Sequence, residues 1–574
     1  MLYIVHIPEF SNITKGKIPM NYLKIKIFSL ILILLLSTTT YATNPYSESP
    51  RTLTPPIWNP DGSFSTDGSL NESEMMLPES EMGMSEYYDS NNKKFSNFVD
   101  GYSLIIPNKM NIDLSLSEVC TTFSDDSLSL KVFKEEFSNN DEILSYVNYS
   151  NRFIENDADH KLEYEESYTE SDTKYYILQW SRDKLKKVED DKNYYACVDV
   201  CKGTDVYTFF FASATPFDCY EDYMLYPNSL QTFTPLLNKK QSYVKKYQGS
   251  NISRLNEYAT QTYNNLFLDS AEFKMGIFSP DKFGGTTRIE QLEKEFSYKF
   301  CAFLTYSEVT DRAGMPLSEY EAKIKEYISK VERNLVYAKN SNKVIELTLQ
   351  TPLSRKNASK NMIYEILNGE YDAFINMYAN MIAKYPNVTV LFRPFNEMNG
   401  DWCNYSAYRT SRDPQIYVEL YRYIFEMFNN AGCDNVIWVW NPNERSFPNY
   451  KWNNELLYYP GDEYVDIYGI TGYNNGTYYP GEIWRSFEEI YSTIYERSLR
   501  INEKPIMITE FSCSEIGGNK VKWVDDMFKI LPKYNRIKVG IWWHATDYDG
   551  EVLSRPYFID SPAGILDVFD KYLN

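Results

Sequence analysis

Histidine is almost absent from this chain, with 3 residues among 574. Protein zinc and copper centres often draw their nitrogen ligands from several histidines, so a histidine-rich metal site is excluded. The sequence also lacks a G-x-S-x-G, a Walker and a dinucleotide-binding fingerprint. We therefore expect neither a metal nor another cofactor.

Positive charge is in deficit as well. The chain has 58 Lys and Arg against 79 Asp and Glu, which gives a formal net charge of −21, and it contains no long basic run. An acidic surface repels the phosphates of nucleic acids and anionic lipids, so neither is an expected partner. We expect the protein to be a monomer.

Long apolar segments are limited to residues 27–36 (IFSLILILLL), a run too short to cross a bilayer comfortably. The run follows Lys24 and Lys26, and the small-residue sequence Thr-Tyr-Ala ends after it at Ala42. This order predicts a signal peptide at 1–42 with its true start at Met20, and a secreted protein that is extracellular or associated with the cell surface. An uncleaved signal anchor is the alternative, and N-terminal sequencing of precursor and mature protein would separate the two.

Cysteine is sparse, and its eight residues divide evenly along the chain. They are Cys120, Cys197, Cys201, Cys219, Cys301, Cys403, Cys433 and Cys513. In a secreted protein these are potential disulfide partners. Four in each half fit two separately oxidised domains, and the sequence leaves the pairing open.

Aromatic residues, in contrast, are abundant: they form 16% of the chain, with 51 Tyr and 10 Trp. Tyr and Trp offer a flat apolar face and a polar edge. That combination suits the binding of sugars, and it equally suits an aromatic core. Composition leaves both readings open.

The length of 574 residues predicts two or three domains. Residues 43–95 are rich in Ser, Pro, Glu, Met and Asn, which is typical of a disordered linker. Residues 96–250 are predicted to form a smaller α+β domain, with strands at 103–107, 128–133, 174–180 and 205–212 and a helix at 141–154. Because this accessory domain shows no constellation of catalytic residue types, a binding or spacer role is expected for it.

From residue 255 to residue 574 strands alternate with helices. The expected strands are 274–278, 298–306, 343–350, 387–395, 435–440, 465–473, 504–511 and 537–543. Between them, Ile324, Ile328, Val331 and Leu335 follow helical spacing, and Gly432 stands where a helix would end. Eight strand–helix units favour an α/β fold, a (β/α)8 TIM barrel, with an open doubly wound sheet as the alternative.

Two glutamates follow strands of this expected barrel. Glu397 comes just after the fourth strand, and counting back by twos places Phe395, Arg393 and Leu391 on the same face. Glu510 comes just after the seventh strand, and the same count places Ile508 and Ile506 on its face. The fourth and seventh strands lie on opposite sides of a barrel mouth, where TIM-barrel active sites are built. A single glutamate after a strand is usually a solvated loop residue, but two carboxylates that face each other are what glycosidic cleavage requires.

A retaining mechanism assigns a separate role to each acid. We predict that Glu510 is the nucleophile and that Glu397 is the acid/base. Arg393 is expected to hold Glu510 ionised, and the negative neighbour is expected to raise the pKa of Glu397. Asn396 is predicted to bind a sugar hydroxyl, and Tyr473 to hydrogen-bond the nucleophile.

Other residues near strand ends are weaker candidates. Asp466 and Glu444 are expected to cap or pair locally, and His544 to be structural. Strand alternation allows only one of Trp542 and Trp543 to face the cleft, and Trp543 is taken as the substrate-binding one.

The segment RPFNEMNGDW, residues 393–402, resembles the acid/base motif R-P-x-H-E-M-N-G-x-W of glycoside hydrolase family 26. The segments NVIWVWNPN (435–443), YYPGDEYVDIYGITGYN (458–474) and KPIMITEFSCSE (504–515) resemble the fifth, sixth and seventh strand regions of that family. The resemblance covers 255–574 and implies acid/base and nucleophile roles for Glu397 and Glu510. It also implies that Tyr473 contacts the nucleophile and that Trp402 and Trp440 are sugar platforms.

The family resemblance implies a retaining endo-β-glycanase that acts on polysaccharide, most often β-1,4-mannan and less often mixed-linkage β-glucan or β-1,3-xylan. A non-catalytic polysaccharide-binding protein is the alternative from another class. Asn396 departs from the motif, because the family has histidine before the acid. Asparagine keeps a hydrogen-bond donor and acceptor but cannot carry a proton, so the mechanism stays intact and the choice of polysaccharide stays open.

Overall fold

The computed structural model describes residues 79–237, 252–312, 314–353, 355, 360–501 and 503–574, and the structural statements refer to these ranges. The predicted signal peptide, the start at Met20 and most of the predicted linker lie outside them. Among the described residues, no helix combines the length and the apolar character needed to cross a membrane.

Eight parallel strands close into a barrel in chain order. They are β12 (Lys274–Phe278), β13 (Ala302–Glu308), β14 (Val344–Gln350), β15 (Val390–Pro394), β16 (Val436–Trp440), β17 (Ile467–Asn474), β18 (Ile506–Cys513) and β19 (Ile537–Trp543). All eight expected strands are present, so the predicted (β/α)8 barrel is confirmed and the open sheet is excluded. The barrel places the carboxyl ends of all its strands at one mouth.

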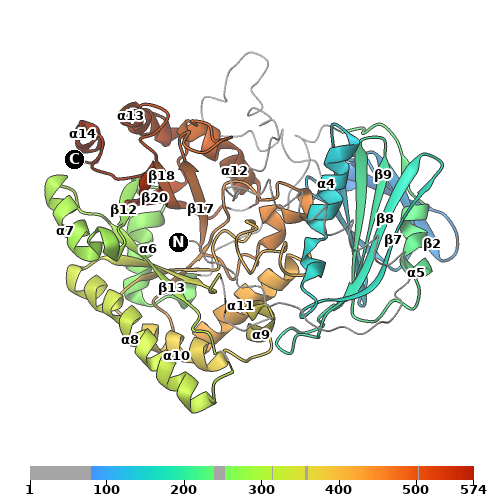
Figure 1. Ribbon diagram of the computed structural model, residues 1–574, viewed down its shortest axis with the longest axis horizontal. Helices are drawn as coiled ribbons and strands as arrows, with labels where there is room; N and C mark the ends of the chain where they lie inside the picture. Colours follow the sequence, from blue (N-terminus) through green and yellow to red (C-terminus); the bar gives the residue numbers. More distant parts are fainter. Residues whose placement is uncertain (1–78, 238–251, 313, 354, 356–359, 502) are drawn as a thin grey trace, which may run out of the picture. The chain divides into compact units, whose positions relative to one another are not determined.

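Helices surround these strands, and Figure 1 shows α7, α8 and α10 along their outer side. The helices of this region are α6 (Glu257–Phe267), α7 (Gly285–Glu295), α8 (Leu317–Ser341), α9 (Met362–Ile366), α10 (Asp372–Ala383), α11 (Gln415–Asn430), α12 (Phe487–Ile501), α13 (Lys520–Ile530) and α14 (Ile565–Leu573). The predicted apolar stripe of α8 is buried, and Gly432 follows α11 with a left-handed φ of 75°. A short hairpin joins β20 (Thr546–Asp549) to β21 (Val552–Pro556).

Strand alternation divides the barrel side chains into two layers. Leu304, Leu391 and Met507 belong to a cluster inside the barrel. Phe392 and Trp438 belong to the larger cluster between the strands and the helices. A side chain can therefore be assigned to the barrel interior or to the helix layer by the cluster that contains it.

The accessory domain consists of two antiparallel sheets with an apolar cluster between them. The larger sheet has the order β4 (Asn111–Asp113), β5 (Thr121–Ser124), β6 (Leu128–Glu136), β10 (Asp205–Ser213), β9 (Tyr194–Lys202), β8 (Thr173–Ser181) and β7 (Lys161–Glu170). The smaller sheet has the order β1 (Gly83–Tyr87), β2 (Asn92–Asn97), β3 (Tyr102–Pro107) and β11 (Gln231–Thr232). The short helix α3 (Glu79–Met82) precedes β1.

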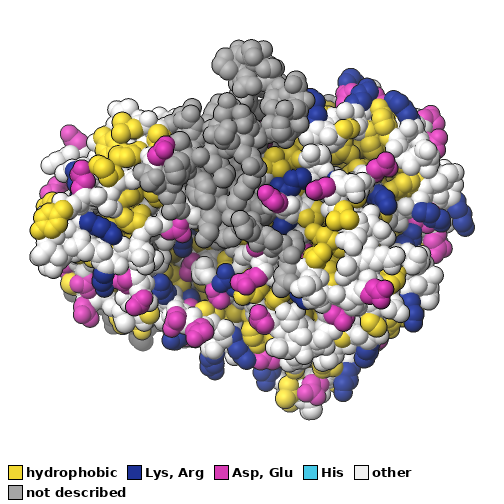
Figure 2. Space-filling view, turned by 180° about the vertical axis from the view of Figure 1, so that it is seen from behind, with side chains coloured by type: hydrophobic (Ala, Val, Ile, Leu, Met, Phe, Trp, Pro, Cys, Tyr) yellow, Lys and Arg dark blue, Asp and Glu magenta, His cyan; other side chains and the backbone are white. Residues whose placement is uncertain are grey.

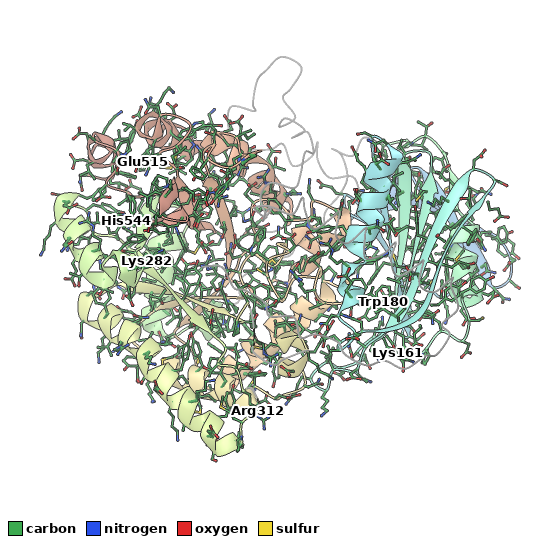
Figure 3. All side chains as sticks on the ribbon, viewed as in Figure 1. Lys161, Trp180, Lys282, Arg312, Glu515 and His544 are labelled. Carbon is green, nitrogen blue, oxygen red and sulfur yellow. The ribbon has the colours of Figure 1, made fainter. Side chains whose placement is uncertain are left out.

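Helix α4 (Asn140–Ser150) and the 3-10 helix η1 (Arg152–Glu155) follow β6, and α5 (Glu221–Asn228) follows β10. Asn139 caps α4 by accepting a hydrogen bond from the Glu142 backbone N–H. Trp180 of β8 stacks on Tyr195 of β9 and packs on Phe153 of η1 (Figure 3). The second face of the large sheet is thus covered by α4 and η1.

The accessory strands differ in part from expectation. The four predicted strands appear as β3, β6, β8 and β10, but β4, β5, β7, β9 and β11 were missed. Strand β1 and most of β2 lie inside 43–95, so the interpretation of that whole segment as a disordered linker is wrong. Short polar strands such as NKKFSN carry little apolar alternation, and β2 is a strand because it pairs with both β1 and β3. The domain boundaries at 96–250 and 255–574 stay predictions.

All eight cysteines lie in the described ranges and all are free thiols, which corrects the expectation of disulfides. Cys197 and Cys201 are both buried on β9, where they pack with the aromatic core of the accessory domain. Both cysteines serve as buried apolar side chains. The even number of cysteines therefore does not indicate disulfide pairing.

Acidic and basic side chains are mixed on the face of the molecule that Figure 2 shows. On the face in Figure 2, Asp and Glu side chains are interspersed with Lys and Arg. The net charge of −21 therefore does not gather into one acidic patch on that face.

Candidate active site

Glu510 is held at both carboxylate oxygens by side chains from three other strands. Arg393 Nη1 lies 2.6 Å from Oε1, and the Tyr306 hydroxyl donates to the same oxygen. The Tyr473 hydroxyl donates to Oε2 over 2.7 Å. Burial, followed by the charge of Glu510, raises the pKa of both tyrosines well above 10, so both phenols remain donors. The predicted contacts of Arg393 and Tyr473 with Glu510 are therefore present, and Tyr306 was missed.

The route by which Glu510 reaches the mouth differs from the simple alternation expected from the sequence. Ile508 pairs with Ile470 and Glu510 pairs with Thr471, so Thr509 is an extra residue in β18. Met507 is inside the barrel and Ile508 is in the outer cluster. The prediction that Ile508 shares the face of Glu510 is therefore wrong. A β-bulge changes the parity of the strand and turns Glu510 inward.

Glu397 reaches the mouth through a left-handed turn. Strand β15 ends at Pro394, and both Phe395 (φ 53°) and Glu397 (φ 58°) are left-handed. Phe395 consequently lies in the outer cluster, so its predicted common face with Glu397 is wrong. The Glu397 backbone N–H donates to the Asn441 carbonyl over 2.7 Å, which fixes the turn against the loop after β16. Left-handed non-glycine residues persist only where their surroundings hold them, and they cluster at functional sites.

Burial and, after it, the negative charge of Glu510 raise the pKa of Glu397 to about 7. Hydrogen bonds from Asn443 and Trp402 act in the opposite direction. The Asn443 amide lies 2.7 Å from Oε1 of Glu397. The predicted increase in the pKa of Glu397 is therefore found, with burial as the larger cause.

A third buried carboxyl group lies beneath the pair. Glu346 is the third residue of β14, has no exposed surface, and lies 3.0 Å from Nε of Arg393. Burial raises its pKa to about 8, although the charge of Arg393 opposes this. Arg393 thus bridges Glu346 and Glu510, and it also donates to Thr348 and Asn441.

We expect Glu346→Gln to stabilise the protein increasingly as pH rises. The folded-state pKa of about 8 lies above the ordinary value of 4.5, so folding keeps this carboxyl protonated, and that contribution is fully present below pH 4.5 and lost as pH rises to about 8. Glutamine keeps the shape and an acceptor for Arg393 but never ionises. The melting temperatures of variant and wild type, measured at about pH 5 and about pH 9, give the comparison. An equal difference at both pH values contradicts the raised pKa of Glu346.

Asn396 and Trp543 are two of the predicted sugar-binding residues. Asn396 is almost fully buried, and Gln350 at the end of β14 donates to its Oδ1 over 2.8 Å. This leaves the amide hydrogens of Asn396 as donors. Trp543 faces the barrel interior at its mouth, stacked on Phe278 with ring centroids 4.0 Å apart.

Trp402 packs directly over Gly400. A Cβ on Gly400 would meet the Trp402 ring at 2.4 Å, so only glycine permits this approach. The ring lies 5.3 Å from that of Phe447. Trp402 is partly buried and hydrogen-bonds Glu397, which places it beside the acid.

The prediction that Trp440 is a sugar platform is wrong. Trp440 is fully buried in the outer cluster, and its ring packs edge-on against Tyr459 and Tyr468. As the last residue of β16 it faces the helix layer, because its neighbour Val439 occupies the inner face. Alternation along β16 could have excluded it.

The weaker candidates behave as expected. Asp466 pairs with Arg254 and accepts from the Trp438 backbone N–H, and Glu444 lies 2.7 Å from Arg485. His544 is buried, accepts from the Ile559 backbone N–H over 3.1 Å, and has its pKa lowered to about 4 by burial. None of the three contacts the Glu397–Glu510 pair among the described interactions.

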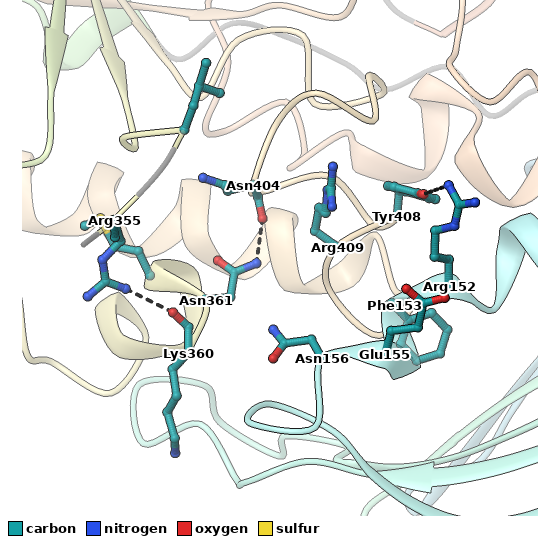
Figure 4. A pocket seen from close by; sticks show the side chains of 12 residues that line it. Arg152, Phe153, Glu155, Asn156, Arg355, Lys360, Asn361, Asn404, Tyr408 and Arg409 are labelled. Atoms are coloured by element: carbon teal, nitrogen blue, oxygen red, sulfur yellow. Dashed lines mark hydrogen bonds between the residues drawn. The ribbon is translucent and has the colours of Figure 1, made fainter. Parts of the chain in front are cut away.

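Sequence reasoning missed four polar residues of the site: Tyr306, Glu346, Gln350 and Asn443. Glu346 and Gln350 interrupt the apolar strand VIELTLQ, which is a signal that could have been used. Tyr306 had no such signal, because tyrosine is ordinary in strands. A cavity of about 370 Å³ elsewhere in the fold, shown in Figure 4, is lined by residues such as Arg152, Asn361 and Tyr408 and by neither acid.

The central part of the barrel matches a known protein family. Residues 343–500 match the model of glycosyl hydrolase family 26. This segment belongs to glycosyl hydrolase family 26. It begins at β14, contains Glu397, and ends in α12 before Glu510.

The curated relatives share only part of their length with this chain. Endoglucanase H of Acetivibrio thermocellus is 36% identical over 197 residues, which are 33% of this chain and 21% of that protein. A mannan endo-1,4-beta-mannosidase of Bacillus subtilis is 36% identical over 115 residues, 19% of this chain and 30% of that protein. The homologous enzyme of strain 168 is 28% identical over 179 residues, 30% of this chain and 44% of that protein. The chain therefore spans less than half the length of each of these relatives.

The solved structures that match this chain include the Bacillus subtilis mannanase BCman and a modular endo-beta-1,4-mannanase from Cellulomonas fimi. The first has a TM-score of 0.38 and 19% identity, and covers 54% of this chain and 91% of that chain. The second has a TM-score of 0.39 and 19% identity, and covers 57% of this chain and 76% of that chain.

Proposed function

We propose that this chain is a retaining endo-β-glycanase with Glu510 as nucleophile and Glu397 as acid/base. The observation that carries the proposal is the contrast between two carboxyl groups at one barrel mouth. Glu510 accepts from Arg393, Tyr306 and Tyr473, while buried Glu397 has a pKa of about 7. One carboxylate bound by a cation and two hydroxyl donors, beside one carboxyl group with a raised pKa, is the division that glycosidic cleavage needs.

In the first step Glu510 attacks the anomeric carbon, and protonated Glu397 gives its proton to the departing glycosidic oxygen. The product of this step is a glycosyl ester on Glu510. Glu397, now ionised, then removes a proton from water, which attacks the same carbon and releases Glu510. The Tyr473 and Arg393 contacts orient the attacking carboxylate, and Asn396 is placed to bind a hydroxyl of the reacting sugar.

β-1,4-Mannan is the proposed substrate, because the family match and several relatives named mannan endo-1,4-beta-mannosidase support it. Mixed-linkage β-glucan is the second candidate, since a 36% identical relative is named Endoglucanase H and Asn396 replaces the histidine of the motif. Secretion is proposed from the leader-like segment 1–42.

Reducing-sugar release from mannan, barley glucan and β-1,3-xylan tests the proposal. We expect the wild type to act on mannan first, and proton NMR of early products to show the β-anomer that retention requires. Initial formation of the α-anomer contradicts the retaining mechanism. No release from any of the three polysaccharides favours a binding protein instead.

A further inference from the structure

The loop between β15 and α11 carries both Glu397 and Trp402, and its second half is bound to the accessory domain. Five loop residues are hydrogen-bonded to side chains of that domain: Asp401, Tyr408, Ser411, Arg412 and Asp413. Apart from Tyr479–Glu482, the described residues of the accessory domain and of the barrel belong to one compact unit, so the contacts between them lie within that unit. The accessory domain therefore contacts the segment that presents the proposed acid/base.

The contact nearest the acid is made by Tyr149 of α4. Its hydroxyl donates to Oδ2 of Asp401, the residue directly before Trp402. Burial and then the charge of Asp401 raise the pKa of Tyr149 far above its usual range, so the phenol stays a donor. The Tyr149 ring also stacks on Tyr408, with centroids 4.8 Å apart and planes at 26°. Arg152 donates to the Tyr408 hydroxyl over 3.4 Å, as Figure 4 shows.

Arg412 anchors the far end of the loop inside the accessory sheet. Its side chain is fully buried, and its Nη2 donates to the Tyr146 hydroxyl over 2.7 Å. Thr208 of β10 lies 2.7 Å from the same hydroxyl and donates to buried Asp199. A buried cation is tolerated only with such partners, and all of these partners belong to the accessory domain.

The loop also contains two residues whose backbone conformation is energetically unfavourable by itself. Ser411 and Arg412 both have φ 56°, in the left-handed region that non-glycine residues rarely occupy. His160 Nε2 lies 3.1 Å from the Ser411 hydroxyl, so accessory side chains hold both residues. Left-handed non-glycine residues persist when the surrounding structure over-determines them, and here the accessory domain supplies part of that surrounding, together with Tyr364 of α9, whose hydroxyl lies 3.0 Å from that of Ser411.

We propose that the accessory domain is a positioning element of the acid/base, in which Tyr149 is the positioning residue that holds Asp401, and thereby Trp402, beside Glu397. This inference rests on the proposed role of Glu397. On this proposal the accessory domain is a part that the chemical step requires, and not a separate binding or spacer module as expected from the sequence. Tyr149 itself does not touch the reacting atoms.

Tyr149→Phe in the full chain tests the inference, because it removes only the hydroxyl. We expect kcat on mannan to fall about tenfold with KM unchanged, as small displacements of a catalytic group are costly. On a dinitrophenyl β-mannobioside, whose leaving group needs no proton, kcat/KM should stay at the wild-type value. Asp401→Ala should show the same kinetic changes as Tyr149→Phe. The double variant Tyr149→Phe/Asp401→Ala should lose no more kcat on mannan than the slower single variant, because both substitutions remove the same contact.

Tyr164→Phe is the matched control. It removes another tyrosine–carboxylate hydrogen bond of the accessory domain, to Glu166 on the exposed strand β7. We expect wild-type kinetics on both substrates. A loss in Tyr149→Phe that is equal on both substrates, a change confined to KM, or no change overturns the inference.

Glu397→Ala, measured beside these variants, separates the two proposals. If Glu397→Ala loses kcat/KM on mannan but keeps it on the dinitrophenyl glycoside, and Tyr149→Phe does not show this pattern, only the positioning inference fails. If Glu397→Ala shows no dependence on the leaving group, the proposed role of Glu397 fails with it.

Discussion

Glu510→Ala is expected to lower kcat on the preferred polysaccharide by on the order of 10⁴-fold or more, since no other group can form the glycosyl ester. The variant removes the carboxylate that Arg393, Tyr306 and Tyr473 hold in place. Substrate binding should persist, because these three side chains remain. Initial rates with KM measured separately give the comparison.

A covalent trap makes the Glu510 prediction sharper. A 2-deoxy-2-fluoro glycosyl fluoride should increase the intact mass of the wild type by one glycosyl unit and leave Glu510→Ala unmodified. Glu515→Ala is the matched control, because Glu515 follows the same strand but lies outside the acid pair, nearest to Lys520 at 3.9 Å (Figure 3 labels Glu515). Equal labelling or equal sugar release by wild type and Glu510→Ala contradicts the nucleophile assignment.

Glu397→Gln is expected to lower kcat/KM on polysaccharide by on the order of 10²- to 10⁴-fold, the usual contribution of general acid catalysis. In the wild type the pKa of Glu397 is about 7, so the reactive protonated form is present below that pH. The rate kcat/KM should therefore fall as pH rises through about 7, and this alkaline limb should disappear in Glu397→Gln.

The leaving group provides the control for Glu397 within one protein. With a dinitrophenyl glycoside the first step needs no proton, so Glu397→Ala should keep its kcat/KM. Sodium azide should speed turnover of the accumulated glycosyl-enzyme, because it replaces the water that Glu397 activates. An alkaline limb that survives in Glu397→Gln contradicts the acid assignment.

The strands were predictable because each is a short apolar run followed by a helix with one apolar face, as in VIWVW and IKVGIWW. The two acids were predictable because parallel barrel strands end at one mouth. The accessory domain was harder, since the polar, exposed strand β7 differs little in composition from a loop. Strand pairing, a long-range property, decides such segments.

The side chain orientations were less predictable than the positions. Simple alternation assigned Ile508 and Phe395 to the inner face, and both are in the outer cluster. A bulge at Thr509 and left-handed φ angles at Phe395 and Glu397 changed the parity. Neither feature has a local signature, because both result from the pairing of β18 with β17 and from the hydrogen bond of Glu397 to Asn441.

By itself the sequence determined the barrel, the two carboxyl groups and the neighbours Arg393 and Tyr473, since strand periodicity and the order of strands place these residues at one mouth. Only the tertiary structure decided that burial is a larger cause of the raised pKa of Glu397 than the charge of Glu510, because burial depends on packing between distant segments. It also decided that Trp440 is core, that the cysteines are thiols, and that Tyr149 and Asp401 meet. These depend on contacts between segments far apart in the chain, and periodicity carries no information about them.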